Sequence, residues 1–203
     1  RSYFTVNLTN RYERVRVIGD IHGCYTALQQ AITPWDEKTL YIFCGDYLER
    51  GIENKEMMYE MMRLSTLPNT IMLEGNHERH IANFAFNSNL DHSKRFMKEV
   101  VAPIVKDMTK KDVESLQREL RLFYKSLRQC YPFSFYGKKY LVSHGGLSYV
   151  PNMTFIATST FINGFGAYET DIAKIYDNNY EKGMCQNFIQ IHGHRGVPRS
   201  EEH

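Results

Sequence analysis

The sequence is poor in several features that mark particular classes of protein. It has only four cysteines, Cys24, Cys44, Cys130 and Cys185, and they form no CxxC pair. This wide spacing argues against a zinc ribbon and against a disulfide framework. Lys and Arg number 25 against 23 for Asp and Glu, so the formal net charge is only +2. The chain therefore lacks the basic excess of a dedicated nucleic-acid binder.

Long apolar runs are also missing. No stretch approaches the roughly 18 residues that a membrane-spanning helix needs, so we expect no membrane association. The 203 residues suit one domain, 1–203, with a sizeable core. The sequence starts at Arg1 without a charged-then-apolar leader. We therefore expect the sequence to be a piece of a longer chain. We also expect the protein to be cytoplasmic, with its cysteines reduced.

Five short apolar segments share one pattern, because each ends in Gly or Ser beside Asp, Asn or His. They cover residues 15–20, 40–46, 70–76, 140–144 and 188–194. Runs of this length and composition predict strands that are buried on both faces. Helical stretches over 25–32 and 54–64 separate the first three strands. This alternation predicts an α/β fold with right-handed crossovers and a mainly parallel βαβαβ core.

The remaining segments have a different character. The methionines of 54–64 recur at helical spacing, and we interpret them as core packing. Residues 79–130 predict a helical insertion, with helices over 90–108 and 109–127 and Thr109 as an N-cap. Such an insertion either shapes substrate access or forms a packing layer, and the sequence does not separate the two. Residues 151–182 predict loops and a short helix.

Side chains that bind metals cluster at the ends of the predicted strands. They are Asp20 with His22, Asp46, Asn76 with His77, His144, and His192 with His194. The carboxyl ends of parallel strands meet at one edge of a sheet, so we expect these groups to share a crevice. Imidazole with carboxylate and amide oxygen suits Mn, Fe, Zn, Co or Ni, whereas calcium prefers oxygen ligands alone.

Five motifs occur in order along the chain. They are GDIHG at 19–23, GDYLERG at 45–51, GNHE at 75–78, HGGLS at 144–148 and GH at 193–194. In this order they resemble the calcineurin-like metallophosphoesterase superfamily. The greatest similarity is to the phosphoprotein-phosphatase branch, which includes bacterial and phage Ser/Thr phosphatases and diadenosine tetraphosphate hydrolases. The resemblance extends over about residues 15–196.

The resemblance implies a sandwich of mixed sheets with a helical insertion and a site for two divalent ions. Asp20 and His22 would hold the first ion, and Asp46 would bridge both. Asn76, His144 and His194 would hold the second ion. Manganese is the expected metal, with iron, zinc, nickel and cobalt as alternatives. Such a metal pair serves phosphoryl displacement, in which a water that bridges the ions attacks phosphorus in line.

The same resemblance assigns roles to the groups around the metals. His77 would be the general acid, and Arg50 would bind the substrate phosphate with help from Asn76 and Arg195. The family usually has Asp where this chain has Glu49, the carboxylate that orients the acid. Because Glu49 is one methylene longer, we expect reduced or altered activity. A second phosphate-binding arginine has no clear counterpart, and Arg79 and Arg195 are its candidates.

Several alternatives stay open at this point. The substrate is a phosphoprotein, a dinucleoside polyphosphate or an RNA or DNA end, and a non-catalytic binding scaffold is the main competing class. A nuclease of the same superfamily would favour a second ligand at position 196, which is glycine. His192 is either a ligand or a supporting residue. We expect His80, His92 and His203 to be ordinary surface residues.

Overall fold

The computed structural model describes residues 4–88, 90–150 and 152–194, whose strands form two sheets. The first sheet is parallel and has the order β2 (Arg14–Ile18), β3 (Thr39–Phe43), β4 (Thr70–Met72). The second has the order β1 (Val6–Asn7), β5 (Cys130–Phe135), β6 (Lys138–Ser143), β7 (Phe188–His192). β5 and β6 pair antiparallel, whereas the other neighbours in this sheet are parallel.

The expected α/β fold with mixed sheets is confirmed, with corrections in detail. All five predicted strands are present, but β1 and β5 were not predicted. Burial on both faces holds for β3, in which every residue is buried, and is wrong for the edge strands β2 and β7, whose side chains are mostly exposed or partly exposed. The reason is position, because β3 lies between two strands whereas β2 forms an edge of the sheet.

Helices surround the two sheets. Their bounds are α1 (Tyr25–Ile32), α2 (Asn54–Leu64), α3 (Glu78–Ala85), α4 (Lys94–Phe96), α5 (Ala102–Val105), α6 (Lys110–Ser126), α7 (Thr158–Asn163) and α8 (Ile172–Glu181). Short 3-10 turns cover Asp91–Ser93 and Met153–Phe155, and a π-helical turn covers Met97–Val101. In the described part of the chain, none of the helices is long and apolar enough to cross a membrane.

The helical predictions are confirmed in outline. α1 and α2 have the predicted bounds, and Met57, Met58 and Met61 of α2 are fully buried. Thr109 caps α6 in a reciprocal capping box with Asp112. The helical stretch predicted over 90–108 is confirmed over 91–105, where 3-10, α and π turns follow one another without a break. Residues 151–182 contain two helices and a 3-10 turn instead of one short helix.

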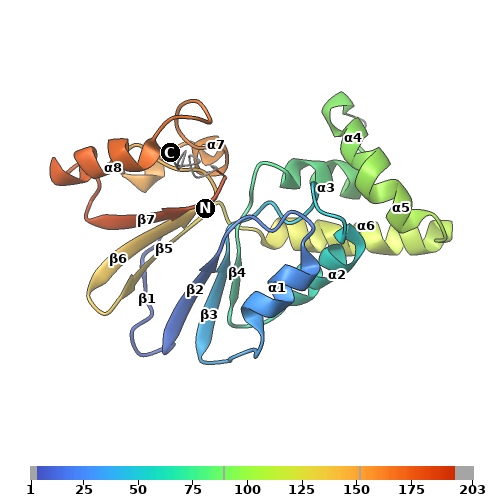
Figure 1. Cartoon of the computed structure of the whole chain (residues 1–203), viewed down its shortest axis with the longest axis horizontal. Coiled ribbons are helices and arrows are strands. Elements are labelled where there is room, and N and C mark those ends of the chain that lie inside the picture. The colour runs from blue at the N-terminus through green and yellow to red at the C-terminus, as the bar shows by residue number, and fades with distance from the viewer. Residues whose placement is uncertain (1–3, 89, 151, 195–203) are drawn as a thin grey trace, which may run out of the picture.

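Three apolar clusters define the layers. Successive side chains of a strand point to opposite faces, and β3 shows this clearly. Ile42 of β3 packs with Val142 of β6 in the core between the sheets, while Tyr41 and Phe43 pack against the α1, α2 and α6 side. On the far face Leu141 of β6 packs against α7 and α8. Figure 1 shows α1 and α2 beside β2–β4, and α8 along β7.

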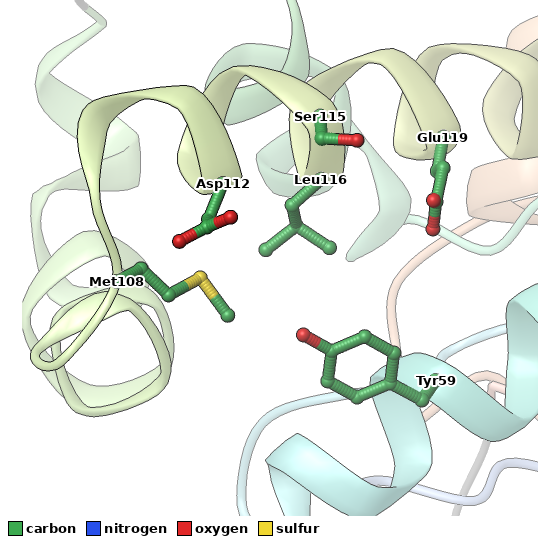
Figure 2. A pocket seen from close by; sticks show the side chains of 6 residues that line it. All are labelled: Tyr59, Met108, Asp112, Ser115, Leu116 and Glu119. Carbon is green, nitrogen blue, oxygen red and sulfur yellow. The ribbon is translucent and has the colours of Figure 1, made fainter.

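The insertion packs against α2 and α3 through one face of α6. Leu116, Leu120 and Phe123 of this face are buried. On the outer side a pocket lies between α2 and α6. Figure 2 shows Tyr59 of α2 facing Asp112 and Glu119 of α6 across this pocket. The insertion is therefore continuous with the core cluster that covers the first sheet.

Candidate active site

The loops at the carboxyl ends of five strands meet at one place. Asp20 follows β2, Asp46 follows β3 and Asn76 follows β4, while His144 and His194 follow β6 and β7. Contacts across these loops join the two sheets, because the backbone N–H of His194 donates to both oxygens of Asp20, at 3.1 and 3.2 Å. The site is thus assembled from both sheets.

The loop backbones have unusual conformations. His22, Asp46, Glu49, Arg50 and His194 have positive φ angles between 46° and 73°. This left-handed region disfavours residues with a side chain, and such strain concentrates at functional sites. The left-handed turns redirect the loops after β2, β3 and β7, which helps to bring the side chains together.

One group of ligand atoms surrounds His144, whose side chain is fully buried. Its Nε2 lies 3.4 Å from Asp46 Oδ2 and 3.0 Å from Asn76 Oδ1. His194 Nδ1 lies 3.1 Å from the same Nε2 and 2.9 Å from Asn76 Oδ1. Because His144 Nδ1 donates to the Cys44 carbonyl at 2.9 Å, Nε2 of a neutral ring presents a lone pair to this group.

A second group shares Asp46. His22 Nε2 lies 3.6 Å from Asp46 Oδ2 and 3.9 Å from Asp20 Oδ2. His22 Nδ1 donates to the carbonyl of Leu48 at 3.2 Å, so a neutral ring turns the lone pair of Nε2 toward the two carboxylates. This Nε2 is buried and has no hydrogen-bond partner among the described residues. A buried polar atom without a partner is costly, and its presence indicates a missing ligand.

These acceptor atoms need positive charge between them, because lone pairs and carboxylates repel one another. Protons supply part of this positive charge. Burial lowers the pKa of His144, but the hydrogen bond and charge of Asp46 outweigh burial, so the pKa of His144 is raised. The carboxylates of Asp20 and Asp46 lie too far from His22 Nε2 for a hydrogen bond. A cation between the two carboxylates would bind both. The residues present therefore fit a cation site, and the imidazole–carboxylate–amide set suits a transition metal.

His77 and Glu49 form a pair at the edge of these groups. His77 Nδ1 donates directly to Glu49 Oε2, and His77 Nε2 lies 3.9 Å from Asp46 Oδ2. The hydrogen bond to Glu49 raises the pKa of His77, against the effect of burial. Burial pushes the pKa of Glu49 upward, but the hydrogen bond and charge of His77 outweigh it and lower that pKa. The longer carboxylate thus reaches the imidazole.

Glu78 is a site residue whose role the sequence interpretation missed. Its carboxylate is fully buried and accepts backbone N–H groups from Asp46 (2.9 Å), Tyr47 (3.1 Å) and Gly75 (2.6 Å). Burial and the neighbouring charge of Asp46 raise the pKa of Glu78 to about 7. Glu78 therefore ties the loop after β3 to the loop after β4. The GNHE motif contained it, but its partners lie far away in the sequence.

The other predicted residues have varied placements. Arg50 is exposed, and its charge acts on His77. Arg79 is exposed on α3, and Arg195 lies outside the described residues. His192 Nδ1 donates to its neighbouring Gly193 carbonyl at 2.9 Å, and His192 is not part of either ligand group.

The prediction for the remaining histidines was partly wrong. His80 is buried, with 6% of its surface exposed, because the insertion covers it. His92 is exposed as predicted, and His203 lies outside the described residues.

The chain belongs to the calcineurin-like phosphoesterase family, whose model matches residues 13–203. The fold and the motif order that the sequence indicated are thereby confirmed. A serine/threonine-protein phosphatase 2 from Salmonella typhimurium is 37% identical over 79 residues. The aligned part is 37% of this chain and 34% of that relative. The match thus spans about a third of the length of this curated phosphatase.

Two solved structures share part of the architecture. One is a serine/threonine phosphatase from Saccharomyces cerevisiae, with 20% identity and a TM-score of 0.47 over 85% of this chain and 51% of that chain. The other is described as a putative diadenosine tetraphosphatase, with 20% identity and a TM-score of 0.46 over 76% of this chain and 60% of that one.

Proposed function

We propose that this protein is a phosphoesterase that hydrolyses a phosphomonoester or a related phosphate ester with the help of two divalent metal ions. One observation carries the proposal, namely that two groups of converging ligand atoms share Asp46. A carboxylate common to two such groups supports a pair of ions that it bridges, which is the arrangement used for phosphoryl displacement.

The ligands divide between the two groups. Asp20 and His22 would hold one ion, Asn76, His144 and His194 the other, and Asp46 would bind both. Manganese is our leading choice, with iron, zinc, nickel or cobalt as alternatives. When bound, such ions activate a water nucleophile and neutralise phosphate charge. The backbone N–H of His194 fixes the Asp20 carboxylate, and the N–H of His77 fixes Asp46 Oδ1 at 3.0 Å.

The proton for the leaving oxygen would come from His77. Its Nδ1 is held by Glu49, so Nε2 is the nitrogen that faces the ligand groups. The hydrogen bond to Glu49 raises the pKa of His77, which favours the protonated ring that a general acid requires. Arg50, exposed on the adjacent loop, would bind the substrate phosphate through its guanidinium. We keep Asn76 and Arg195 as further substrate contacts.

One relative is named a serine/threonine-protein phosphatase, and one solved structure is described as a putative diadenosine tetraphosphatase. We keep a phosphoprotein, a dinucleotide or a nucleic-acid end as the proposed substrate range. The scaffold hypothesis rested on Glu49 in place of the usual Asp. The direct hydrogen bond between Glu49 and His77 supports an enzyme over a scaffold, because Glu49 still supplies a carboxylate to orient the proposed acid.

The test compares Asp46→Asn with Asp107→Asn, which changes an exposed aspartate between α5 and α6. Metal content per chain and hydrolysis of p-nitrophenyl phosphate are measured with Mn²⁺. We expect Asp46→Asn to lose bound metal and to reduce turnover by about 10²-fold or more, whereas Asp107→Asn behaves as wild type. An Asp46→Asn protein with full metal content and turnover, or a wild-type chain that binds no metal, would refute the proposal.

A further inference from the structure

His80 lies on α3, three residues after His77, which is the N-cap of this helix. The ring of His80 is buried and is not used by the reaction described above. One of its nitrogens lies within 4.8 Å of both a Glu49 oxygen and a His77 nitrogen. The rings of His77 and His80 meet edge to face, with centroids 5.9 Å apart. His80 therefore packs against the His77 ring and has a nitrogen near the Glu49 carboxylate.

The helical insertion fixes His80 from the other side. His80 Nδ1 and the hydroxyl of Ser93 form a hydrogen bond of 2.8 Å, and Ser93 is fully buried. Phe96, also buried, stacks on the His80 ring with centroids 5.6 Å apart and planes inclined by 21°. A polar contact and a stacking contact together leave the ring little freedom to rotate.

The side chain of Glu49 needs such support. It has one more rotatable bond than an aspartate would have, so its carboxylate can adopt more conformations. Glu49 also stands on a left-handed loop, with φ 73°. Burial lowers the pKa of His80, so a neutral ring borders Glu49 and does not compete with His77 for its negative charge.

We propose that His80 is a positioning residue: it holds the Glu49 carboxylate against His77, and through Ser93 and Phe96 the helical insertion thereby sets the orientation of the general acid. This inference rests on the proposed function, in which His77 protonates the leaving oxygen. It gives the insertion a role in catalysis rather than in packing alone.

The cluster of Glu49, His77 and His80 also has the composition of a metal site. The structure favours positioning, because His77 Nδ1 donates directly to Glu49 Oε2 and both groups are satisfied by each other without an ion. His80 in turn has the Ser93 hydroxyl as its partner. A third metal site is therefore an outcome that the test must detect.

The first experiment measures kcat and KM of the Mn²⁺-loaded protein on p-nitrophenyl phosphate and phenyl phosphate. Nitrophenolate leaves readily without a proton, whereas the more basic phenolate needs one, so a misplaced acid slows only the second ester. We expect His80→Phe to lower kcat about tenfold on phenyl phosphate and less than about twofold on p-nitrophenyl phosphate. Ser93→Ala, which keeps the ring, has a smaller effect of the same kind.

The matched control is His92→Phe, which makes the same change at an exposed histidine that touches the outer side of His80. It should leave both esters unaffected. The second comparison repeats His80→Phe in a Glu49→Asp background. The shorter aspartate has fewer conformations and needs less support. In the Glu49→Asp background, His80→Phe should therefore lower kcat on phenyl phosphate by a factor at least about three times smaller than in wild type. An equal loss in both backgrounds and on both esters would show a general structural role and overturn the proposal.

A third measurement needs no catalysis. In the metal-free protein with 15N-labelled histidine, the His77 Nδ1–H that Glu49 accepts should give a sharp downfield proton signal. We expect it to broaden in His80→Phe and to persist in His92→Phe, and an unchanged signal in both would contradict the proposal. If wild type hydrolyses neither ester, the proposed function fails while this signal still tests the positioning. If His80→Phe removes a bound Zn²⁺ and leaves turnover unchanged, the cluster is a metal site and the proposal is wrong.

Discussion

Among single residues, Asp46 is the one that both proposed ligand groups share. One of its oxygens accepts the N–H of His77, and the other faces His22, His77 and His144 at 3.4 to 3.9 Å. Burial alone would raise the pKa of Asp46, but the hydrogen bond and charge of His144 outweigh it and lower the pKa to about 2. Asp46 is therefore ionised at neutral pH, as a bridging ligand must be.

His77 should separate acid catalysis from metal binding. Replacement by alanine removes the proton donor but none of the proposed ligands, so kcat on phenyl phosphate should fall by about 10²–10⁴-fold. Metal content should stay at the wild-type level. Steady-state kinetics and metal analysis of the same preparation check this, with His92→Ala as control. Full turnover in His77→Ala would exclude it as the acid.

At the level of elements, the loops after β3 and β4 depend on each other. Glu78 lies at the start of α3 and accepts N–H groups from both loops, so one carboxylate sets their relative position. Asp46 and Asn76 stand on these two loops. A change at Glu78 should therefore alter metal binding even though Glu78 is not one of the proposed ligands.

Glu78→Gln tests this coupling. An amide cannot accept at both of its atoms, so at least one buried N–H loses its partner and unfolding free energy should fall by about 1–3 kcal/mol. Metal affinity should fall as well. Glu60→Gln is the matched control, because Glu60 is a buried glutamate of α2 bound by Gln29 and Arg63. Denaturant unfolding and Mn²⁺ titration check both variants. Unchanged metal affinity in a folded Glu78→Gln protein would contradict the coupling.

The elements with local signals were predictable from the sequence. β3 and α2 have apolar patterns that fix their type, and the strand-end rule placed Asp46 and His144 at one rim. β1 has only two residues and no local signal of its own. β5 contains Pro132, which cannot donate to a sheet and so masks the strand.

Residues that act through distant partners were not predictable. The burial of His80 depends on Ser93 and Phe96, which reach it only because the insertion folds back onto α3. The role of Glu78 likewise depends on N–H groups more than thirty residues away in the sequence. Periodicity and motif spacing describe neighbours along the chain, so contacts of this kind appear only in three dimensions.

At the scale of the whole molecule, the candidate site joins the two sheets. Asp20, Asp46 and Asn76 follow strands of the parallel sheet, whereas His144 and His194 follow strands of the mixed sheet. Ions bound among these residues would link the sheets only in the folded state. Metal binding should therefore stabilise the fold as a whole.

Thermal unfolding with and without metal tests this linkage. One site filled at 100 times its dissociation constant adds about 2.7 kcal/mol to the free energy of unfolding. Mn²⁺ should raise the Tm of wild type, and EDTA should reverse the rise. Asp46→Asn should show no response, while Asp107→Asn should respond fully. A Tm of wild type that is insensitive to Mn²⁺ would count against a site shared by the sheets.

Anomalous diffraction from crystals grown with Mn²⁺ shows whether Asp46 is shared by two ions, because it reports the number, element and position of the ions together. We expect two manganese peaks on either side of Asp46, one beside Asp20 and His22 and the other beside Asn76, His144 and His194. A single peak, or peaks that do not share Asp46, would rule out a two-metal site.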